Sequence, residues 1–288
     1  MLKEVQFYRR FCLSAVLAVV LLTLLAPVTA GATAASHPLK GVALGQSGLA
    51  TALVGPATTY LALGDSLAFG YQPSKDFAHG YVNDFFQDLQ NHSVKQLNNL
   101  GCSGETSYTM ILGFCPGAPK GTSPQLAAAL SYLSAHAGHV SPVTLDIGAN
   151  DVLHDFDLKT CTVNKVLFYT NLAILDADLK VIILPLLHRA LTVKGRLTGD
   201  LLVMNYYDAF QNLCPGLLSY VQTLNRHIAD DIKGQATLVD VFGAFGGTQT
   251  PNPNLCSYTW MCNNPPDIHA TNKGYGVIAG AFEAQAGY

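Results

Sequence analysis

Short apolar, β-prone runs alternate with helical stretches after residue 58, and this alternation limits the fold more than any other feature of the chain. The first three runs each lead directly into a glycine. Strands that alternate with helices indicate a parallel sheet covered by helices on both faces. We therefore predict an α/β fold with a three-layer α/β/α sandwich around a five-stranded parallel sheet. The expected strands are 58–63, 95–100, 140–147, 201–206 and 236–241, and the expected helices are 79–89, 124–136, 166–187 (interrupted by Pro185), 217–231 and 274–282.

The N-terminus predicts an exported protein. Three basic residues precede an uncharged apolar run at 11–25, and small residues follow at 28–34. This order is typical of a cleaved signal peptide. The alternative is an uncleaved membrane anchor, because the stretch 11–28 reaches the lower limit for a membrane span. The predicted organisation is a signal peptide at 1–34, an N-terminal arm at 35–57 and one domain at 58–288.

Six cysteines lie outside this segment, and an even number in an exported chain indicates disulfides. Proximity in the sequence favours the pairs Cys102–Cys115, Cys161–Cys214 and Cys256–Cys262. A zinc site is the alternative, but the chain has no C-x-x-C motif and no cluster of Cys and His at ligand spacing. The formal net charge of −3 offers no basic surface for nucleic acid. We expect no metal, no cofactor and no nucleic-acid partner.

Polar residues of chemical interest follow the predicted strands. Ser66 follows the first predicted strand, a glycine-rich loop at 101–106 follows the second strand, and Asn150 follows the third strand. Asp267 and His269 lie near the C-terminus. Ligand sites of parallel sheets lie at the carboxyl ends of the strands. Each residue also has an ordinary interpretation, such as a helix N-cap for the serine or an Asx-turn for the asparagine.

A serine hydroxyl is a weak nucleophile that needs a base, and histidine is the most common one. That histidine in turn needs a group, usually a carboxylate, to fix its tautomer. Ser66, His269 and Asp267 could supply all three roles. The G-x-S-x-G elbow of α/β-hydrolases is absent from the chain.

Four ordered blocks of this chain resemble the SGNH-hydrolase (GDSL esterase/lipase) superfamily, and its cysteine pattern is similar to that of the secreted bacterial lipases and esterases. The resemblance implies the flavodoxin-like SGNH fold. It also implies a nucleophilic Ser66, a base at His269, and an oxyanion hole formed by the N–H groups of Ser66 and Gly104 with the side chain of Asn150. The blocks are Gly64-Asp65-Ser66-Leu67, Asn99-x-Gly101-x-Ser103-Gly104-x-Thr106, Gly148-x-Asn150-Asp151, and Asp267-x-His269 with Gly274-Tyr275.

One block departs from the family pattern. The usual last motif is Asp-x-x-His, which would place the acid at position 266, where this chain has Pro266. Two interpretations follow. Asp267 reaches the imidazole of His269 through a different loop, or a backbone carbonyl orients the ring.

The resemblance implies a secreted serine hydrolase of carboxylic esters, a lipase or esterase that acts as a monomer on small-molecule or lipid esters and makes transient contact with lipid surfaces. The alternatives within the family are a carbohydrate O-deacetylase, a phospholipase or a thioesterase. A non-catalytic secreted binding protein and a thiol enzyme that uses Cys102 are alternatives of other classes. Tyr71, Tyr206, Tyr207 and Trp260 are either pocket residues or, more commonly for aromatics, core residues.

Overall fold

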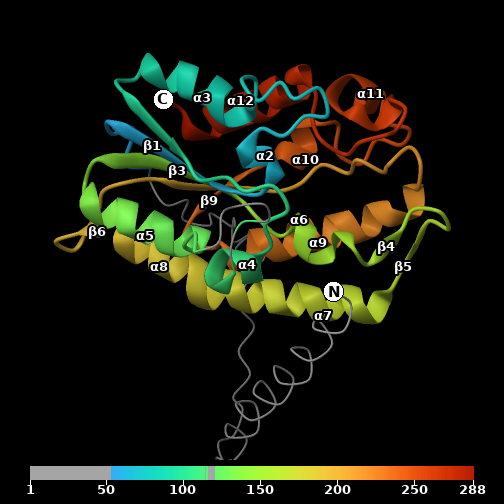
Figure 1. Cartoon of the computed structure of the whole chain (residues 1–288), viewed down its shortest axis with the longest axis horizontal. Helices are drawn as coiled ribbons and strands as arrows, with labels where there is room; N and C mark the ends of the chain where they lie inside the picture. The colour runs from blue at the N-terminus through green and yellow to red at the C-terminus, as the bar shows by residue number, and fades with distance from the viewer. Residues whose placement is uncertain (1–52, 114, 116–120) are drawn as a thin grey trace, which may run out of the picture. The chain divides into compact units, whose positions relative to one another are not determined.

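A five-stranded parallel sheet forms the centre of the fold (Figure 1). The computed structural model describes residues 53–288 except 114 and 116–120. The strand order β2-β1-β3-β8-β9 places the first strand between the second and third, as in flavodoxin-like sheets. The predicted fold class is confirmed. The strands are β1 (Thr59–Gly64), β2 (Gln96–Asn99), β3 (Val140–Asp146), β8 (Leu201–Met204) and β9 (Thr237–Val239), all paired in parallel.

Helices cover both faces of the sheet (Figure 1). α3 (Tyr81–Gln90) and α12 (Asn272–Ala286) lie on one face. Every residue of β1, β3 and β8 is buried. Burial on both faces explains why β1 and β8 are mostly apolar and do not alternate with polar surface residues. The opposite face carries α5 (Gln125–Ala135), α7 (Lys165–Ala177), α8 (Leu184–Ala190) and α9 (Leu218–Asp231).

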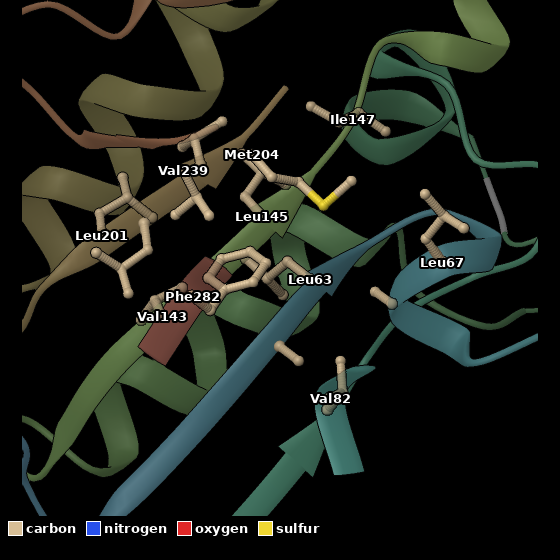
Figure 2. Packing of buried hydrophobic residues seen from close by; sticks show 14 of the residues in the cluster. Leu63, Leu67, Val82, Val143, Leu145, Ile147, Leu201, Met204, Val239 and Phe282 are labelled. Carbon is tan, nitrogen blue, oxygen red and sulfur yellow. The ribbon is translucent and has the colours of Figure 1, made fainter. Parts of the chain in front are cut away.

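The core lies between the sheet and these helices. Figure 2 shows Leu63, Leu145 and Val239 of three different strands near Phe282 of α12. Each of these four side chains is fully buried. Truncating a buried phenylalanine to alanine typically costs about 3–5 kcal/mol, so this packing holds α12 and the C-terminal site residues just before it against the sheet.

The helix expected at 166–187 differs from the prediction. The stretch continues through a π-helical segment, η1 (Asp178–Ile183), into α8 without a break at Pro185. Pro185 is the second residue of α8 and follows η1 closely, so the continuous helix lacks one N–H donor at this point.

Two strands end earlier than predicted. β8 ends at Met204 because the Asn225 side chain bonds both the N–H and the carbonyl of Tyr206, at 2.9 and 2.7 Å, and so removes them from the ladder. β9 ends at Val239 because the Asp240 side chain accepts from Gly243 N–H and caps the next helix.

Several short elements were not predicted, and most of them border the carboxyl edge of the sheet. They are too short to show a clear hydrophobic period. They comprise α2 (Ser66–Phe69), α4 (Ser107–Leu112), α6 (Ala149–Leu153), α10 (Val241–Ala244), α11 (Leu255–Tyr258), the hairpins β4 (Phe156–Asp157) with β5 (Thr162–Val163) and β6 (Thr192–Val193) with β7 (Arg196–Leu197), and the 3-10 turns η2 (Pro215–Leu217) and η3 (Trp260–Cys262).

Three disulfides join loops around this edge, and they are the pairs that sequence proximity favours. Their Cα separations are 5.6, 5.2 and 5.2 Å for Cys102–Cys115, Cys161–Cys214 and Cys256–Cys262. The Cys102 sulfur is therefore bonded and cannot act as a nucleophilic thiolate, so the thiol-enzyme alternative does not fit the structure.

The last residues of the predicted N-terminal arm contact the domain. Val54 and Gly55 donate backbone N–H bonds to the Asp200 carboxylate at 2.6 and 2.9 Å, and Ala57 N–H bonds the Ser141 carbonyl. The predicted signal peptide, its alternative as a membrane anchor, and most of the arm lie outside the described residues. Within residues 53–288, as far as they are described, no helix has the length and apolar character needed to cross a membrane.

Candidate active site

Ser66 begins the short helix α2 directly beyond the end of β1. The preceding Asp65 is the N-cap, and its carboxylate accepts from Leu67 N–H at 2.9 Å. Gly70 ends the helix in the left-handed conformation. The serine is thus held on a tight turn at the carboxyl edge of the sheet, with 8% of its surface exposed.

Gly64 makes this turn possible. Its φ of 138° lies in the region that favours glycine, and a Cβ there would lie 2.4 Å from the carbonyl oxygen of Asp146. No side chain fits at that distance. The glycine of the first block therefore lets the end of β1 approach β3 closely, which sets where Ser66 begins.

His269 lies between Ser66 and Asp267. The distance from His269 Nε2 to Ser66 Oγ is 2.8 Å, and that from His269 Nδ1 to Asp267 Oδ1 is 2.7 Å. The carboxylate oxygen can only accept, so Nδ1 carries the proton and Nε2 is free to accept from the serine hydroxyl. The arrangement can transfer a proton from serine to histidine.

A tight turn lets Asp267 reach His269 although only one residue separates them. Asp267 Oδ1 accepts from the backbone N–H of His269 at 2.9 Å as well as from its ring. This Asx-turn folds the aspartate back toward a histidine only two residues on. Of the two interpretations, the geometry favours orientation by the Asp267 carboxylate.

Asn150 belongs to α6, which follows β3. One hydrogen of its Nδ2 is donated to the Glu105 carbonyl at 2.9 Å, which leaves the second hydrogen for another acceptor. Gly104, immediately before Glu105, has a φ of 84°. No acceptor within the described residues takes the N–H of Ser66 or of Gly104. These groups are the kind of donors that an oxyanion hole requires.

A largely apolar cavity opens beside Ser66, His269 and Asn150. The space amounts to about 650 Å³ when it is counted out to its open mouth. Gly104 is not among the residues that line it. The apolar walls come from Leu67, Ala149, Val152, Leu153, Phe156, Ala209, Phe210, Val221, Leu224 and Ile268.

One buried carboxyl group lies in the cavity wall. Asp208 follows β8 and is 3% exposed, and its Oδ1 accepts from Phe210 N–H at 2.8 Å. Burial raises the pKa of Asp208 to about 6. The cavity wall therefore gains a charge as the pH rises through that value.

A second buried group braces the serine turn from behind. Asp146 Oδ2 accepts from the N–H groups of Asp65 and Ala68 at 3.1 and 3.2 Å, and its Oδ1 accepts from Tyr81 Oη. Burial, with the neighbouring Asp65 carboxylate, raises the pKa of Asp146 well above its usual range. Burial and the neighbouring carboxylate therefore favour the neutral form of the Asp146 carboxyl group.

Two of the four aromatic candidates are pocket residues, whereas Tyr71 and Trp260 are half-buried and belong neither to the cavity lining nor to the hydrophobic core. Tyr206 and Tyr207 line the cavity, and Tyr206 Oη also donates to Asp65 at 2.9 Å. Tyr71 packs on the His269 ring with centroids 4.4 Å apart. Trp260 does not line the cavity, and its backbone N–H bonds the His269 carbonyl.

Sequence reasoning missed the residues that form most of the cavity, because Val221, Leu224 and Phe210 are ordinary apolar residues of no motif. It also missed Gln125, a buried polar residue directly before the apolar run Leu126–Leu130 of α5. That contrast between one polar side chain and its apolar neighbours is a signal that could have identified it. Among the described residues no group of three or more His, Cys, Asp or Glu side chains could hold a metal ion.

Comparisons with known proteins give one family and one fold. Solved structures share the fold at 17–19% identity, a level at which the likeness concerns the fold alone. They include an acetylxylan esterase, Axe2, from Geobacillus stearothermophilus (18% identity, 82% of this chain and 96% of that chain, TM-score 0.52). A lipase from a goat rumen metagenome has 19% identity, with 80% and 97% of the two chains covered and a TM-score of 0.53. Phospholipase A1 from Streptomyces albidoflavus has 17% identity, with 80% and 99% covered and a TM-score of 0.50.

No curated protein matches the chain. The sequence model of the GDSL-like lipase/acylhydrolase family matches residues 62–277, which include all four blocks. The chain thus belongs to the GDSL-like lipase/acylhydrolase family and is, as its motifs predict, a carboxylic ester hydrolase.

Proposed function

We propose that this protein is an exported serine esterase or lipase that cleaves esters with apolar acyl chains through an acyl-enzyme on Ser66. The observation that carries the proposal is the continuous hydrogen-bonded series from Ser66 Oγ through His269 to Asp267, with distances of 2.8 and 2.7 Å. The series opens onto a largely apolar cavity.

In the first step, His269 Nε2 takes the hydroxyl proton as Ser66 Oγ attacks the ester carbonyl carbon. The C–O bond to the alcohol then breaks, and His269 gives its proton to the leaving alkoxide. In the second step, His269 takes a proton from water, the resulting hydroxide attacks the acyl-enzyme, and Ser66 regains its proton as the acid leaves.

The oxyanion of each step is assigned to the N–H groups of Ser66 and Gly104 and to the free Nδ2 hydrogen of Asn150. Support comes from the open N–H groups and from the contact that fixes Asn150 on the Glu105 carbonyl. Loss of one such donor typically lowers turnover by about 10²–10³-fold.

The cavity lining favours a fatty acyl chain over a sugar as the buried part of the substrate. Ten of the seventeen residues that line this space are apolar, and burial of apolar surface contributes about 25 cal/mol per Å². Carbohydrate O-deacetylation is the alternative in the same family, and a structural neighbour is described as an acetylxylan esterase.

Export, a monomeric state and transient contact with lipid surfaces complete the proposal. Three disulfides support an oxidising compartment. Contact with lipid is supported by exposed Leu158 and Leu213, which flank the Cys161–Cys214 bridge beside the cavity residues Phe156 and Phe210.

The test is hydrolysis of p-nitrophenyl esters from acetate to palmitate, and of an acetylated xylo-oligosaccharide, by the wild type and Ser66→Ala. Ser131→Ala on the exposed surface of α5 is the matched control. We expect activity on medium and long acyl chains that Ser66→Ala abolishes and Ser131→Ala retains. Activity confined to acetate and the acetylated sugar would instead support the deacetylase. Activity that survives in Ser66→Ala would refute the assigned nucleophile.

A further inference from the structure

A buried side-chain amide, that of Gln125, joins two parts of the site that no motif connects. Gln125 is the first residue of α5 and is 6% exposed. Its Oε1 accepts from Gly64 N–H at 2.7 Å, and its Nε2 donates to the Gly64 carbonyl at 2.9 Å and to Glu105 Oε2 at 3.1 Å. Both amide hydrogens are therefore used, and the group has one defined orientation.

The first of these partners controls the serine turn. Gly64 is the last residue of β1 and lies two positions before Ser66. Its carbonyl also accepts from Cys102 N–H at 3.0 Å. The same peptide group thus anchors the serine turn and the start of the loop that contains Gly104.

The second partner, Glu105, contacts or adjoins the other two oxyanion donors, the Asn150 amide and the Gly104 N–H. The Glu105 side chain is fully buried on Gln125, and its backbone carbonyl accepts from Asn150 Nδ2 at 2.9 Å. Gly104 is covalently next to Glu105. A displacement of Glu105 would therefore move both the Gly104 N–H and the Asn150 amide relative to Ser66.

From these contacts we infer that Gln125 is a positioning residue, which sets the spacing of the three oxyanion donors through Gly64 and Glu105. The inference rests on the proposed function, because it assigns a role relative to that oxyanion hole. A displacement of about 1 Å at such a site can cost about 10²-fold in rate. If the Gln125 amide had a purely structural role, its removal would lower the stability of the fold without a selective loss of rate.

The test replaces Gln125 by methionine, which preserves its length and removes all three hydrogen bonds. The matched control is Gln211→Met, since Gln211 is also a buried glutamine, and its side chain makes four hydrogen bonds, to Gly247, Gln249, Thr250 and Asn252. We expect both variants to lose stability, but Gln125→Met alone to lose about 10²-fold in kcat, with KM within about threefold of the wild type. Affinity for a boronic acid, which forms a tetrahedral adduct with serine, should fall in parallel, while affinity for the product acid stays unchanged.

A residue exchange tests the link through Glu105. Gln125→Glu places a second carboxyl group beside that of Glu105, whose pKa is already raised by burial. The double variant Glu105→Gln/Gln125→Glu restores one amide–carboxyl pair. We expect it to recover about tenfold in kcat over Gln125→Glu alone.

The outcomes separate this inference from the proposed function. A wild type that hydrolyses esters, with Ser66→Ala inactive and Gln125→Met no slower than Gln211→Met, would overturn the role of Gln125 alone. If the double variant Glu105→Gln/Gln125→Glu has no higher kcat than Gln125→Glu, the link through Glu105 is overturned. A wild type that hydrolyses no ester and whose Ser66 is not labelled by a fluorophosphonate would overturn both proposals.

Discussion

Replacing Asp267 by asparagine and by alanine separates two contributions of this side chain to His269. A single oxygen, Asp267 Oδ1, accepts from both the backbone N–H and the ring Nδ1 of His269. An asparagine keeps an acceptor oxygen, and the backbone N–H favours that oxygen over the NH₂ group at this position. We therefore expect Asp267→Asn to retain the ring orientation and lose the charge, while Asp267→Ala loses both.

The size of each effect follows from the geometry. Opposite charges about 4 Å apart attract by about 4 kcal/mol at an effective dielectric of about 20. The Asp267 side chain is 26% exposed, so screening reduces this to about 2 kcal/mol. At about 1.4 kcal/mol per tenfold, the asparagine variant should lose roughly 30-fold in kcat. Loss of the charge-assisted hydrogen bond adds about 2 kcal/mol, so the alanine variant should lose roughly 10³-fold.

The assay is kcat on one p-nitrophenyl ester, with the thermal unfolding midpoint measured in parallel. Asp157→Ala is the matched control, because Asp157 Oδ1 accepts from Lys159 N–H at 2.9 Å in a similar turn on the exposed hairpin β4–β5. An asparagine variant as slow as the alanine variant would refute the argument that the backbone N–H selects the oxygen. An alanine variant within about threefold of the wild type would refute the role of the carboxylate.

Three further outcomes are expected. Asn150→Ala should lower kcat about 10²–10³-fold with little change in KM, since one oxyanion donor is lost, and a fall smaller than about tenfold would contradict that role. Gly64→Ala should destabilise the fold by more than about 4 kcal/mol in urea unfolding, because its Cβ would lie 2.4 Å from the Asp146 carbonyl oxygen, whereas Gly216→Ala, with nothing within 4 Å, should not. Burial raises the pKa of Asp208 from an ordinary 3.8 to about 6 in the folded protein, so the unfolding free energy should fall as the pH rises between these values. Asp208→Asn should therefore be more stable than the wild type at neutral pH, by up to about 3 kcal/mol, and should show no such gain below both pKa values. An equal gain at both pH values would contradict the titration of Asp208.

The fold class was predictable because its signals are local. Buried parallel strands such as β1 and β8 are mostly apolar, and this property is visible in any short window of sequence. The ends of β8 and β9 were not predictable, because Asn225 and Asp240 decide them with side-chain hydrogen bonds. Asn225 lies on α9, 19 positions after Tyr206, beyond the short window in which a strand is recognised.

The site was predictable only where the chemistry needs particular residue types. A serine, a histidine and an asparagine at strand ends in the right order carry that information by themselves, and the topology of a parallel sheet explains why they meet. Ser66 and His269 are 203 positions apart and yet lie in hydrogen-bond contact.

The sequence alone determined the α/β class, the family blocks and the favoured cysteine pairs, because each depends on residue type and short-range spacing. Tertiary structure decided that Asp267 reaches His269, since a turn rather than a spacing rule sets that distance. It also decided which apolar residues line the cavity and that Gln125 joins Gly64 to Glu105. These features depend on contacts between distant segments, and a leucine or glutamine in such a contact has the same local sequence signal as one in the ordinary core.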